Sequence, residues 1–490
     1  MANMVNPYPD TFRLRRKIKA NFHTHSKYSD GRLELQRVID LYSRLQYKVL
    51  MISDHDVFGG FVNADNKGLT LIPGVEVSDG GPHMLQVGIG DKIKPDPDRQ
   101  AVIDAINNAG GYAIMNHPKW EPGLNHWPVD VLLKLRNYLG IEIINGNCYH
   151  DAGSAEALDV WDAVLSAGKR IWGMGNDDCH FTHDVGICRN TILTDDPSPR
   201  GILHALKRGS FYVSTGIEIN NITMKNKAIV VTCRDADIIV AIGEHGCELA
   251  YGKSGSITFD VEKIVMPYVR FECYGRGRKR AFTQPFFNQD SLSYKPVPKT
   301  TALRIADVKS ISDIKTELWQ KGAAVTEMIS VKKGVSAEDS TRFCILYDRK
   351  NIYIKALCYE PDTSKLEKSR TRSIYSDDSV EFFFDPGRTC NEYYQIVVNA
   401  AGNVEVLKNT PHTLCTIKGL VIKAALKPRR YEIALSIPFK SITAAYPAHN
   451  AWGLNFIRNR TGLKRDSYVW SWTGTYNHLP SRFGVLEFDQ

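Results

Sequence analysis

The sequence predicts an α/β N-terminal region followed by an all-β C-terminal domain. Three observations support this division. Short apolar runs alternate with segments of helical periodicity up to about Gly216. From Ile217, expected strands follow one another without intervening helices. A polar segment with two prolines at 289–300 then precedes a second strand-rich region. The chain has 490 residues, of which 43% are apolar, so it is long enough for two or three domains with substantial cores.

The N-terminal segments are expected to alternate between strand and helix. Residues 17–22 are predicted to form a strand, and 33–46 carries apolar residues at helical spacing. Further helices are expected at 98–108 and 155–167, and further strands in the apolar runs KVLMIS, LTLIPGVEVS, HMLQVGI, GGYAIMNHP, GIEIINGN and RIWGMGNDDCH. Such alternation is typical of a parallel sheet or barrel, whose site lies at the carboxyl ends of the strands.

Imidazole and carboxylate side chains collect near the ends of these expected strands. They are the donors that hydrolytic divalent metals use, namely His23, His25, Asp30, His55, Glu76, His83, His117, Asp178 and His180. Residues two apart in a strand face the same side, so His23 and His25 can point at one cation, as can Asp178 and His180. Glu76 lies in an otherwise apolar strand, where an unpaired carboxylate would be costly. The pattern predicts a metal-dependent hydrolase.

The ordered motifs FHTHSKYSDG, ISDHD, IPGVEVS, PHMLQVG, NHP and GNDDCH resemble the polymerase and histidinol phosphatase (PHP) family over about residues 17–216. The resemblance implies a distorted barrel of about seven βα units that binds two or three divalent metal ions, with Zn, Mn and Fe as the expected metals. Asp30 fills a position where some relatives have histidine. The ligand sets that the resemblance implies are His23, His25, Glu76 and Asp178 for one ion, Glu76, His83 and His117 for a second, and Asp30, His55 and His180 for a third.

Other residues of the same motifs are predicted to take part in chemistry. Paired cations lower the pKa of a bound water toward about 7, so no protein nucleophile is required for attack on phosphorus. His180 or Asp56 is expected to protonate the leaving group, and Asp56 fits equally well as a residue that orients a ligand histidine. Lys119 and His183 are predicted to contact the substrate because they lie close to ligand motifs, with a solvated loop residue as the alternative for each.

Two β-rich regions are expected after the α/β region. Glycine-bearing turns between KAIVVTC, ADIIVAIG, GSITFDV and YVRFECYG predict a small β module over 217–290, which resembles the module often appended to PHP enzymes. After a linker at about 289–300, the region 301–490 is dominated by expected strands and predicts a β-sandwich. The order of SDDSVEFFFDP, YYQIVVNAAG, YEIALSIPF and WGLNFIRNR resembles the family nine carbohydrate-binding modules.

This second resemblance implies a carbohydrate ligand for the C-terminal domain. Sugar-binding domains stack aromatic rings on the apolar face of a pyranose, and Trp470, Trp472 and Tyr476 are the candidates for this contact. The two tryptophans are two positions apart and would share a face. The alternative is that both tryptophans fill the sandwich core.

Charge and composition limit the expected partners. The net charge is +8, and the excess lies in residues 301–490, which hold 27 Lys and Arg against 20 Asp and Glu. A positive accessory domain suits an anionic ligand such as a phosphorylated glycan, whereas the sequence has no dense basic stripe that would indicate nucleic acid. No apolar run reaches the roughly 20 residues of a membrane span, no secretory signal is evident, and the ten cysteines form no close-spaced CxxC pair. No membrane partner and a cytoplasmic location are therefore expected.

Together these patterns predict a metal-dependent phosphoesterase that hydrolyses a phosphate monoester or diester on a sugar, polyol or glycan. One alternative keeps the metals but cleaves a non-phosphate bond of a polysaccharide. A second alternative is a noncatalytic glycan-binding protein whose metal site is structural. The full set of predicted ligands argues against the second alternative, because a decayed site would be expected to have lost part of that set.

Overall fold

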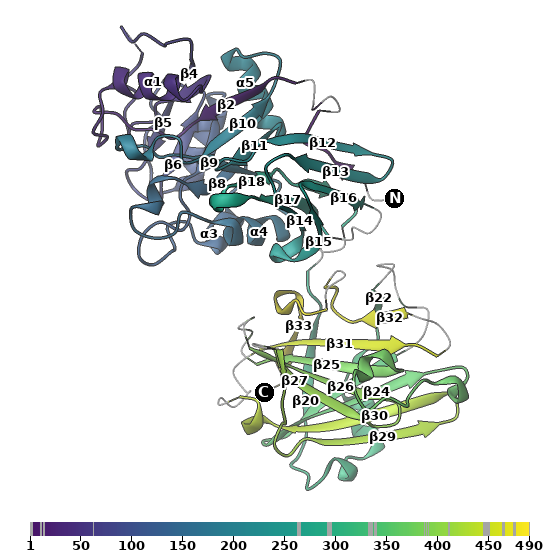
Figure 1. The fold of residues 1–490 in the computed structure, drawn as a ribbon. Helices are drawn as coiled ribbons and strands as arrows, with labels where there is room; N and C mark the ends of the chain where they lie inside the picture. Colours follow the sequence, from purple (N-terminus) through teal and green to yellow (C-terminus); the bar gives the residue numbers. More distant parts are fainter. Residues whose placement is uncertain are drawn as a thin grey trace. The chain divides into compact units, whose positions relative to one another are not determined.

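The protein forms two compact units, residues 1–294 and 295–490, each of which is described by itself (Figure 1). The first unit is mixed α/β and the second is β-rich, as the sequence predicts. The computed structural model describes residues 3–489 apart from 10–11, 13–14, 62, 262–265, 292–295, 332–336, 338–340, 387, 389, 391, 410–411, 444–450, 463–465 and 474–476. None of the helices among these residues has the length and apolar character that crossing a bilayer requires.

Two sheets meet around the centre of the first unit. In one sheet, β2 (Lys17–Asn21) pairs with β3 (Val49–Met51), and β3 pairs with β4 (Thr70–Ile72). The other sheet has the order β5 (Gly74–Val77), β6 (Met84–Val87), β7 (Tyr112–Met115), β8 (Gly140–Asn145) and β9 (Trp172–Asn176).

Two isolated parallel bridges join these sheets just beyond the strand ends. His55, after β3, bridges to Glu76 in β5, and Thr24, after β2, bridges to Cys179, after β9. Because β5 follows β4 after a single residue, Pro73, the pairings run from β2 through β3, β4–β5, β6, β7, β8 and β9 and back to β2. The strands therefore form a ring whose two junctions lie among the predicted metal ligands.

The direction of β6 differs from the parallel arrangement that the sequence predicts. The pairs β2–β3, β3–β4, β7–β8 and β8–β9 are parallel, whereas β6 is antiparallel to both β5 and β7. The connection between β5 and β6, residues 78–83, is too short for the crossover of a dozen or more residues that parallel neighbours need. A hairpin is the remaining way to join them.

Apolar side chains fill the ring and attach helices to its outside. The interior cluster includes Ile18, Val49, Met51, Leu85 and Met174 from four different strands. The helices α1 (Leu35–Arg44), α2 (Arg99–Asn108) and α4 (Leu158–Ser166) agree with the expected helical segments, and the structure adds α3 (Val129–Lys134) and α5 (Pro199–Arg208). Their buried residues recur at helical spacing, as at 102, 103 and 106 in α2, which packs them against the strands.

The sheet that contains β2 continues without a break into the β-rich part of the first unit, which the sequence predicts over 217–290. β10 (Arg189–Leu193) pairs with β2, β11 (Phe211–Ser214) pairs with β10, and β18 (Arg280–Thr283) pairs with β11. The same sheet contains β17 (Tyr268–Tyr274), β19 (Phe286–Asn288), β1 (Met4–Val5), β14 (Ile238–Ile242) and β15 (Glu248–Lys253). A separate three-stranded sheet consists of β12 (Ile219–Lys225), β13 (Ala228–Cys233) and β16 (Ser256–Asp260).

The second unit is one long sheet that curls around an aromatic core. β20 (Lys299–Arg304) pairs with β33 (Gly484–Phe488) on one side and with β23 (Thr341–Tyr347) on the other, so it links the two halves of the sheet. Phe343 of one half stacks on Phe456 of the other, with ring centroids 4.1 Å apart.

The first half contains β25 (Ser379–Asp385), β26 (Tyr393–Asn399), β27 (Val404–Asn409), β28 (His412–Leu414), β31 (Trp452–Arg460), β22 (Ile329–Ser330) and β32 (Asp466–Val469). The other half contains β24 (Asn351–Tyr359), β30 (Arg430–Pro438), β29 (Val421–Lys427) and β21 (Ala323–Val325), with α6 (Thr316–Lys321) beside it. Because the two halves face each other across a shared core, this unit has the layered packing that the sequence predicts.

Candidate metal centre

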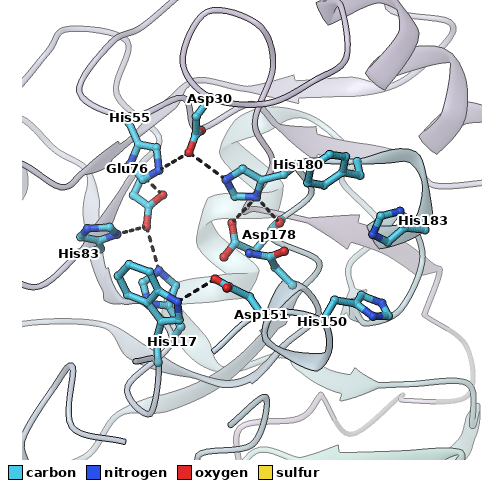
Figure 2. A pocket seen from close by; sticks show the side chains of 13 residues that line it. Asp30, His55, Glu76, His83, His117, His150, Asp151, Asp178, His180 and His183 are labelled. Carbon is cyan, nitrogen blue, oxygen red and sulfur yellow. Dashed lines mark hydrogen bonds and ion pairs between the residues drawn. The ribbon is translucent and has the colours of Figure 1, made fainter. Parts of the chain in front are cut away.

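A pocket of about 420 Å³ opens where the ring strands of the first unit end (Figure 2). Seven of the nine predicted metal ligands line it, and His23 and His25 lie fully buried behind them. Its walls are formed by Asp30, His55, Glu76, His83, His117, Trp120, Asn147, His150, Asp151, Asp178, His180, Phe181 and His183. The structure thus brings the predicted donors together.

Glu76 lies at the centre of the donor cluster, with its two carboxylate oxygens facing different histidines. Its Oε2 atom is 3.0 Å from His23 Nε2 and 3.1 Å from His25 Nε2, whereas Oε1 is 3.2 Å from both His83 Nδ1 and His117 Nε2. The residue is 1% exposed and alternates along β5 with buried Val75 and Val77, so the strand directs it away from the apolar core. One carboxylate therefore faces two sets of imidazoles, as a bridging ligand requires.

Asp178 completes a first group of four donors. Its Oδ1 atom is 3.1 Å from His23 Nε2 and 3.0 Å from His25 Nε2, close to the spacings that these nitrogens have to Glu76. Metal–ligand bonds of about 2.0–2.2 Å place neighbouring donors roughly 3–3.5 Å apart, depending on the coordination geometry, so the group has the spacing of a coordination shell. His25 Nε2 and Asp178 Oδ1 are buried, and neither makes a hydrogen bond within the described part of the chain. These two atoms therefore have lone pairs available to bind a cation.

Asp30, His55 and His180 form a further group at the pocket rim. Asp30 Oδ2 is 3.5 Å from His55 Nε2 and 3.3 Å from His180 Nε2 (Figure 2). The other ring nitrogen of His55 lies 3.4 Å from Glu76 Oε2, and His25 Nδ1 lies 3.6 Å from Asp30 Oδ1. His25 and His55 therefore present one ring nitrogen to each of two neighbouring donor groups.

Opposite charges in the cluster shift the pKa values of their neighbours. Burial alone would raise the pKa of Glu76, but His23, His117 and His25 outweigh it and hold that pKa well below its usual range. Burial likewise opposes protonation of His25, yet the carboxylates of Asp178 and Glu76 raise its pKa to about 10. Without a cation, the carboxylates are thus compensated by protonated imidazoles, and cation binding would release those protons.

Two of the predicted ligands have a strained backbone. His117 has φ 29° and Asp178 has φ 52°, both in the left-handed region that side chains other than glycine seldom adopt. Such conformations persist where the surrounding structure enforces them, and they cluster at functional sites. The strained backbone at His117 and Asp178 is therefore consistent with a function that requires these two side chains to point in fixed directions.

Glu142, which was not among the predicted residues, lies behind His23. The Glu142 carboxylate is buried and accepts a hydrogen bond of 2.8 Å from His23 Nδ1, which leaves His23 Nε2 free to coordinate. It also accepts hydrogen bonds from Asn176 Nδ2 and from the backbone nitrogen of His117. A glutamate in the apolar strand GIEIIN carries the same signal as Glu76, a buried carboxylate that needs strong donors, so the sequence did hold a clue.

His126 is a second residue near the donors that was not predicted. Its Nε2 accepts a hydrogen bond from the His83 backbone nitrogen at 2.9 Å, and its ring lies 4.8 Å from the His83 ring. Burial, together with the nearby His117 and His83, lowers the pKa of His126 to about 3. It therefore acts as a neutral acceptor that fixes the strand carrying His83.

Asp56 does not face the pocket, which corrects the proposed role in protonating the leaving group. Its carboxylate accepts hydrogen bonds from Ser78 Oγ at 2.6 Å and from the backbone nitrogens of Ser78 and Asp79. It holds the turn that follows β5 rather than a ligand histidine. Its neighbour Asp54 accepts from the backbone nitrogen and hydroxyl of Ser26 and so supports the loop after β2.

The two predicted substrate contacts have different positions. Lys119 does not line the pocket, because its Nζ forms an ion pair of 3.0 Å with Asp159. His183 does line it, on the wall away from Glu76, together with His150. The Lys119 side chain is thus largely buried and held by a carboxylate outside the pocket lining.

The candidate sugar contacts lie in the second unit. Trp470 is 6% exposed and packs in the core against Phe456, and Gly484 is so close that an added Cβ would lie 2.6 Å from its ring. Trp472 is 3% exposed, whereas Tyr476 lies outside the described residues. This burial does not agree with sugar stacking on the two tryptophans and favours the core alternative.

Comparisons with known proteins divide along the same two units. Residues 313–490 match the family model described as "carbohydrate family 9 binding domain-like", which confirms the resemblance predicted for the C-terminal region. No curated protein matches the chain.

Several solved structures are similar. A two-domain protein from Bacteroides vulgatus, described as containing a predicted PHP-like metal-dependent phosphoesterase, is 16% identical over 59% of this chain and 91% of its own, with a TM-score of 0.35. A family nine carbohydrate-binding module from Caldicellulosiruptor kristjanssonii in complex with glucose is 17% identical over 39% of this chain and 95% of its own, with a TM-score of 0.31. An amidohydrolase from Chromobacterium violaceum is 18% identical over 33% of this chain and 87% of its own, with a TM-score of 0.26. At these values the likenesses do not decide what this chain binds or cleaves.

Proposed function

We propose that this protein is a metal-dependent phosphoesterase that hydrolyses a phosphate monoester or diester on a sugar, polyol or glycan. The observation that carries the proposal is the position of Glu76. Its Oε2 lies within 3.2 Å of two imidazole nitrogens from the segment after β2, and its Oε1 lies within 3.2 Å of one imidazole nitrogen before β6 and one after β7. In this reading the ring of strands is the distorted barrel of the PHP family.

Three neighbouring groups of residues, two of which share Glu76, would hold the ions. The fit rests on the donor set itself. Four buried donor atoms have spacings near 3 Å, and two of them, His25 Nε2 and Asp178 Oδ1, make no hydrogen bond within the described residues, which suits divalent metals that accept nitrogen and oxygen, such as Zn, Mn or Fe. The groups are His23, His25, Glu76 and Asp178, then Glu76, His83 and His117, and finally Asp30, His55 and His180.

The chemistry that such ions supply when bound is activation of water and neutralisation of phosphate charge. The protein's own residues orient the donors for this task. Glu142 accepts the Nδ1 hydrogen of His23, and the Asp178 carbonyl accepts the Nδ1 hydrogen of His180 at 2.9 Å. In both histidines this fixes the tautomer that turns Nε2 toward the carboxylates.

His180 is thus better suited to hold an ion than to donate a proton. Its Nδ1 hydrogen is engaged by a backbone carbonyl, and its Nε2 lone pair faces Asp30. His183 and His150, on the opposite wall, are exposed and are not engaged in these groups. We therefore place the leaving group of the substrate on the wall formed by His150, Phe181 and His183, with His183 as the predicted substrate contact.

The C-terminal unit is proposed to bind a carbohydrate, so that the two units would act on the same glycan. The match of residues 313–490 to a carbohydrate-binding family supports this part of the proposal. Burial of Trp470 and Trp472 means that the sugar contact would involve other side chains.

The test combines metal analysis with an unbiased substrate panel. Chelated protein is reloaded with Zn²⁺, Mn²⁺ or Fe²⁺ and offered sugar phosphates, polyol phosphates, phosphodiesters, and plain and acylated glycans. We expect metal-dependent release of phosphate or of a phosphomonoester. Cleavage confined to unphosphorylated glycans would support the alternative hydrolase, and bound metal without any turnover would support a structural site.

A further inference from the structure

We infer that His150, His183 and Asp184 form an additional divalent-metal site, separate from the nine predicted ligands, in the wall of the same pocket. The inference does not require the pocket to hydrolyse phosphate; if the pocket does so, His183 would act on the substrate through this ion rather than by direct contact. The site would take an ion that accepts two imidazoles and one carboxylate, and Zn²⁺ is the metal that best suits this donor set.

The three side chains come from two short segments that meet beside the pocket. His150 ends the turn Asn147–Tyr149 after β8, and His183 and Asp184 belong to the turn Thr182–Asp184 after β9. Each residue offers one donor atom, and these atoms all lie within 4.8 Å of one another. The two imidazole rings are 5.1 Å apart at an angle of 84°, an arrangement in which two ring nitrogens can approach a common point (Figure 2).

Asp184 supplies the independent sign of a ligand. Its side chain is fully buried, and Oδ2 accepts hydrogen bonds from the backbone nitrogens of His180 and Phe181 at 2.9 and 2.7 Å. Oδ1, by contrast, is buried and makes no hydrogen bond within the described part of the chain, although it lies 3.3 Å from His183 Nε2. A buried carboxylate oxygen without a donor is costly, and a cation between it and the imidazoles would remove that cost.

The spacing agrees with tetrahedral coordination. Zinc bonds of about 2.0–2.2 Å to nitrogen and oxygen place neighbouring ligand atoms roughly 3.3–3.5 Å apart in a tetrahedron. The 3.3 Å between His183 Nε2 and Asp184 Oδ1 matches this edge. The His183 ring is also held in place, because Phe181 stacks on it at an interplanar angle of 14° with ring centroids 5.3 Å apart.

The alternative is a simple ion pair in which protonated His183 donates to Asp184 and His150 plays no part. The two explanations differ in what His150 does. An ion pair does not require it, whereas a metal site loses one of its three protein ligands when it is removed. The variants below exploit that difference, and they replace only exposed side chains, so the fold is not at risk.

The experiment counts ions in the full-length protein. Chelated wild-type protein and the double variant His150→Ala, His183→Ala are each saturated with Zn²⁺, freed of excess metal by gel filtration, and analysed for zinc and protein. We expect the double variant to hold one equivalent fewer. His204→Ala, which removes an exposed histidine of α5, serves as the matched control and should retain the wild-type number.

A second measurement locates the ion. Anomalous scattering at the zinc edge from crystals of the loaded wild-type protein should show a peak between these three residues, and the single variant His150→Ala should lose it. Equal zinc content in wild type and double variant, or no peak at this position, would overturn the inference. Phosphate release by the wild-type protein on the substrate panel is measured separately and tests the proposed function, so failure of the additional metal site and failure of the proposed function are distinguished.

Discussion

Replacing Glu142 by glutamine tests how far the metal centre depends on the residue behind it. The carboxylate accepts four hydrogen bonds, with Oε1 accepting from His23 Nδ1 and Asn176 Nδ2, and Oε2 accepting from the His117 backbone nitrogen and Asn145 Nδ2. Glutamine has a single side-chain oxygen, so in either orientation its NH₂ group faces two of these donors. Two buried donors then lose their acceptor.

The expected effect has two parts. Each buried donor left without a partner costs about 1–3 kcal/mol, so the free energy of unfolding of the metal-free Glu142→Gln protein should fall by about 2–6 kcal/mol. Loss of a partner behind a ligand histidine typically weakens metal affinity about 10–100-fold, which corresponds to about 1.4–2.8 kcal/mol. Denaturant unfolding in the presence of a chelator measures the first part, and competition with a chromophoric chelator measures the second.

Glu34→Gln is the matched control for this experiment. Glu34 has an exposed side chain that pairs with Lys27, so its replacement should change neither quantity measurably. If Glu142→Gln bound metal as tightly as the wild type and unfolded at the same denaturant concentration, the assignment of Glu142 as a positioning residue would be refuted.

Three further results are expected. Glu76→Gln should lower metal content and turnover together, because the single oxygen of glutamine cannot face both imidazole sets, and full activity with unaltered metal content would contradict the bridging role. Trp470→Ala should destabilise the second unit by about 3–5 kcal/mol in thermal unfolding without changing turnover, whereas Tyr375→Ala, at an exposed ring, should be neutral. Burial raises the pKa of Glu381, so the folded state binds the proton more tightly, and the stabilisation present below the unfolded pKa of about 4.3 is lost as the pH rises. Glu381→Gln cannot ionise, so the stability of this variant relative to wild type should rise between pH 4 and pH 8. The measurement follows the unfolding transition that Trp470→Ala shifts. A stability difference between variant and wild type that stays the same over this pH range would count against this account.

Much of the fold could be predicted because its elements have strong local patterns. Helical spacing identified α1, α2 and α4, and short apolar runs identified the strands. The direction of β6 could not be read from periodicity, because an apolar strand looks the same in either direction. It depends on the length of the connection 78–83, which permits a hairpin and not a crossover.

The donors could be predicted for a related reason. Imidazoles and carboxylates placed directly after apolar runs are unusual enough to be noticed one by one, and strand topology then gathers them at one rim. Asp56 was misjudged because its partners, Ser78 and Asp79, lie more than twenty residues away and are brought near only by the bridge between His55 and Glu76. Trp470 was ambiguous because its burial depends on Gly484, a contact that spacing along one strand does not reveal.

The two bridges that close the ring of strands have a consequence for the stability of the first unit. One bridge contains Glu76 and His55, and the other contains Thr24, whose neighbour His25 donates its backbone hydrogen to Cys179. At these junctions a few backbone hydrogen bonds, rather than full ladders, join the neighbouring segments, and the predicted metal ligands lie beside them. Ions bound by side chains from both sides of a junction would link the two sheets there. Metal binding and folding of the first unit would then be thermodynamically coupled.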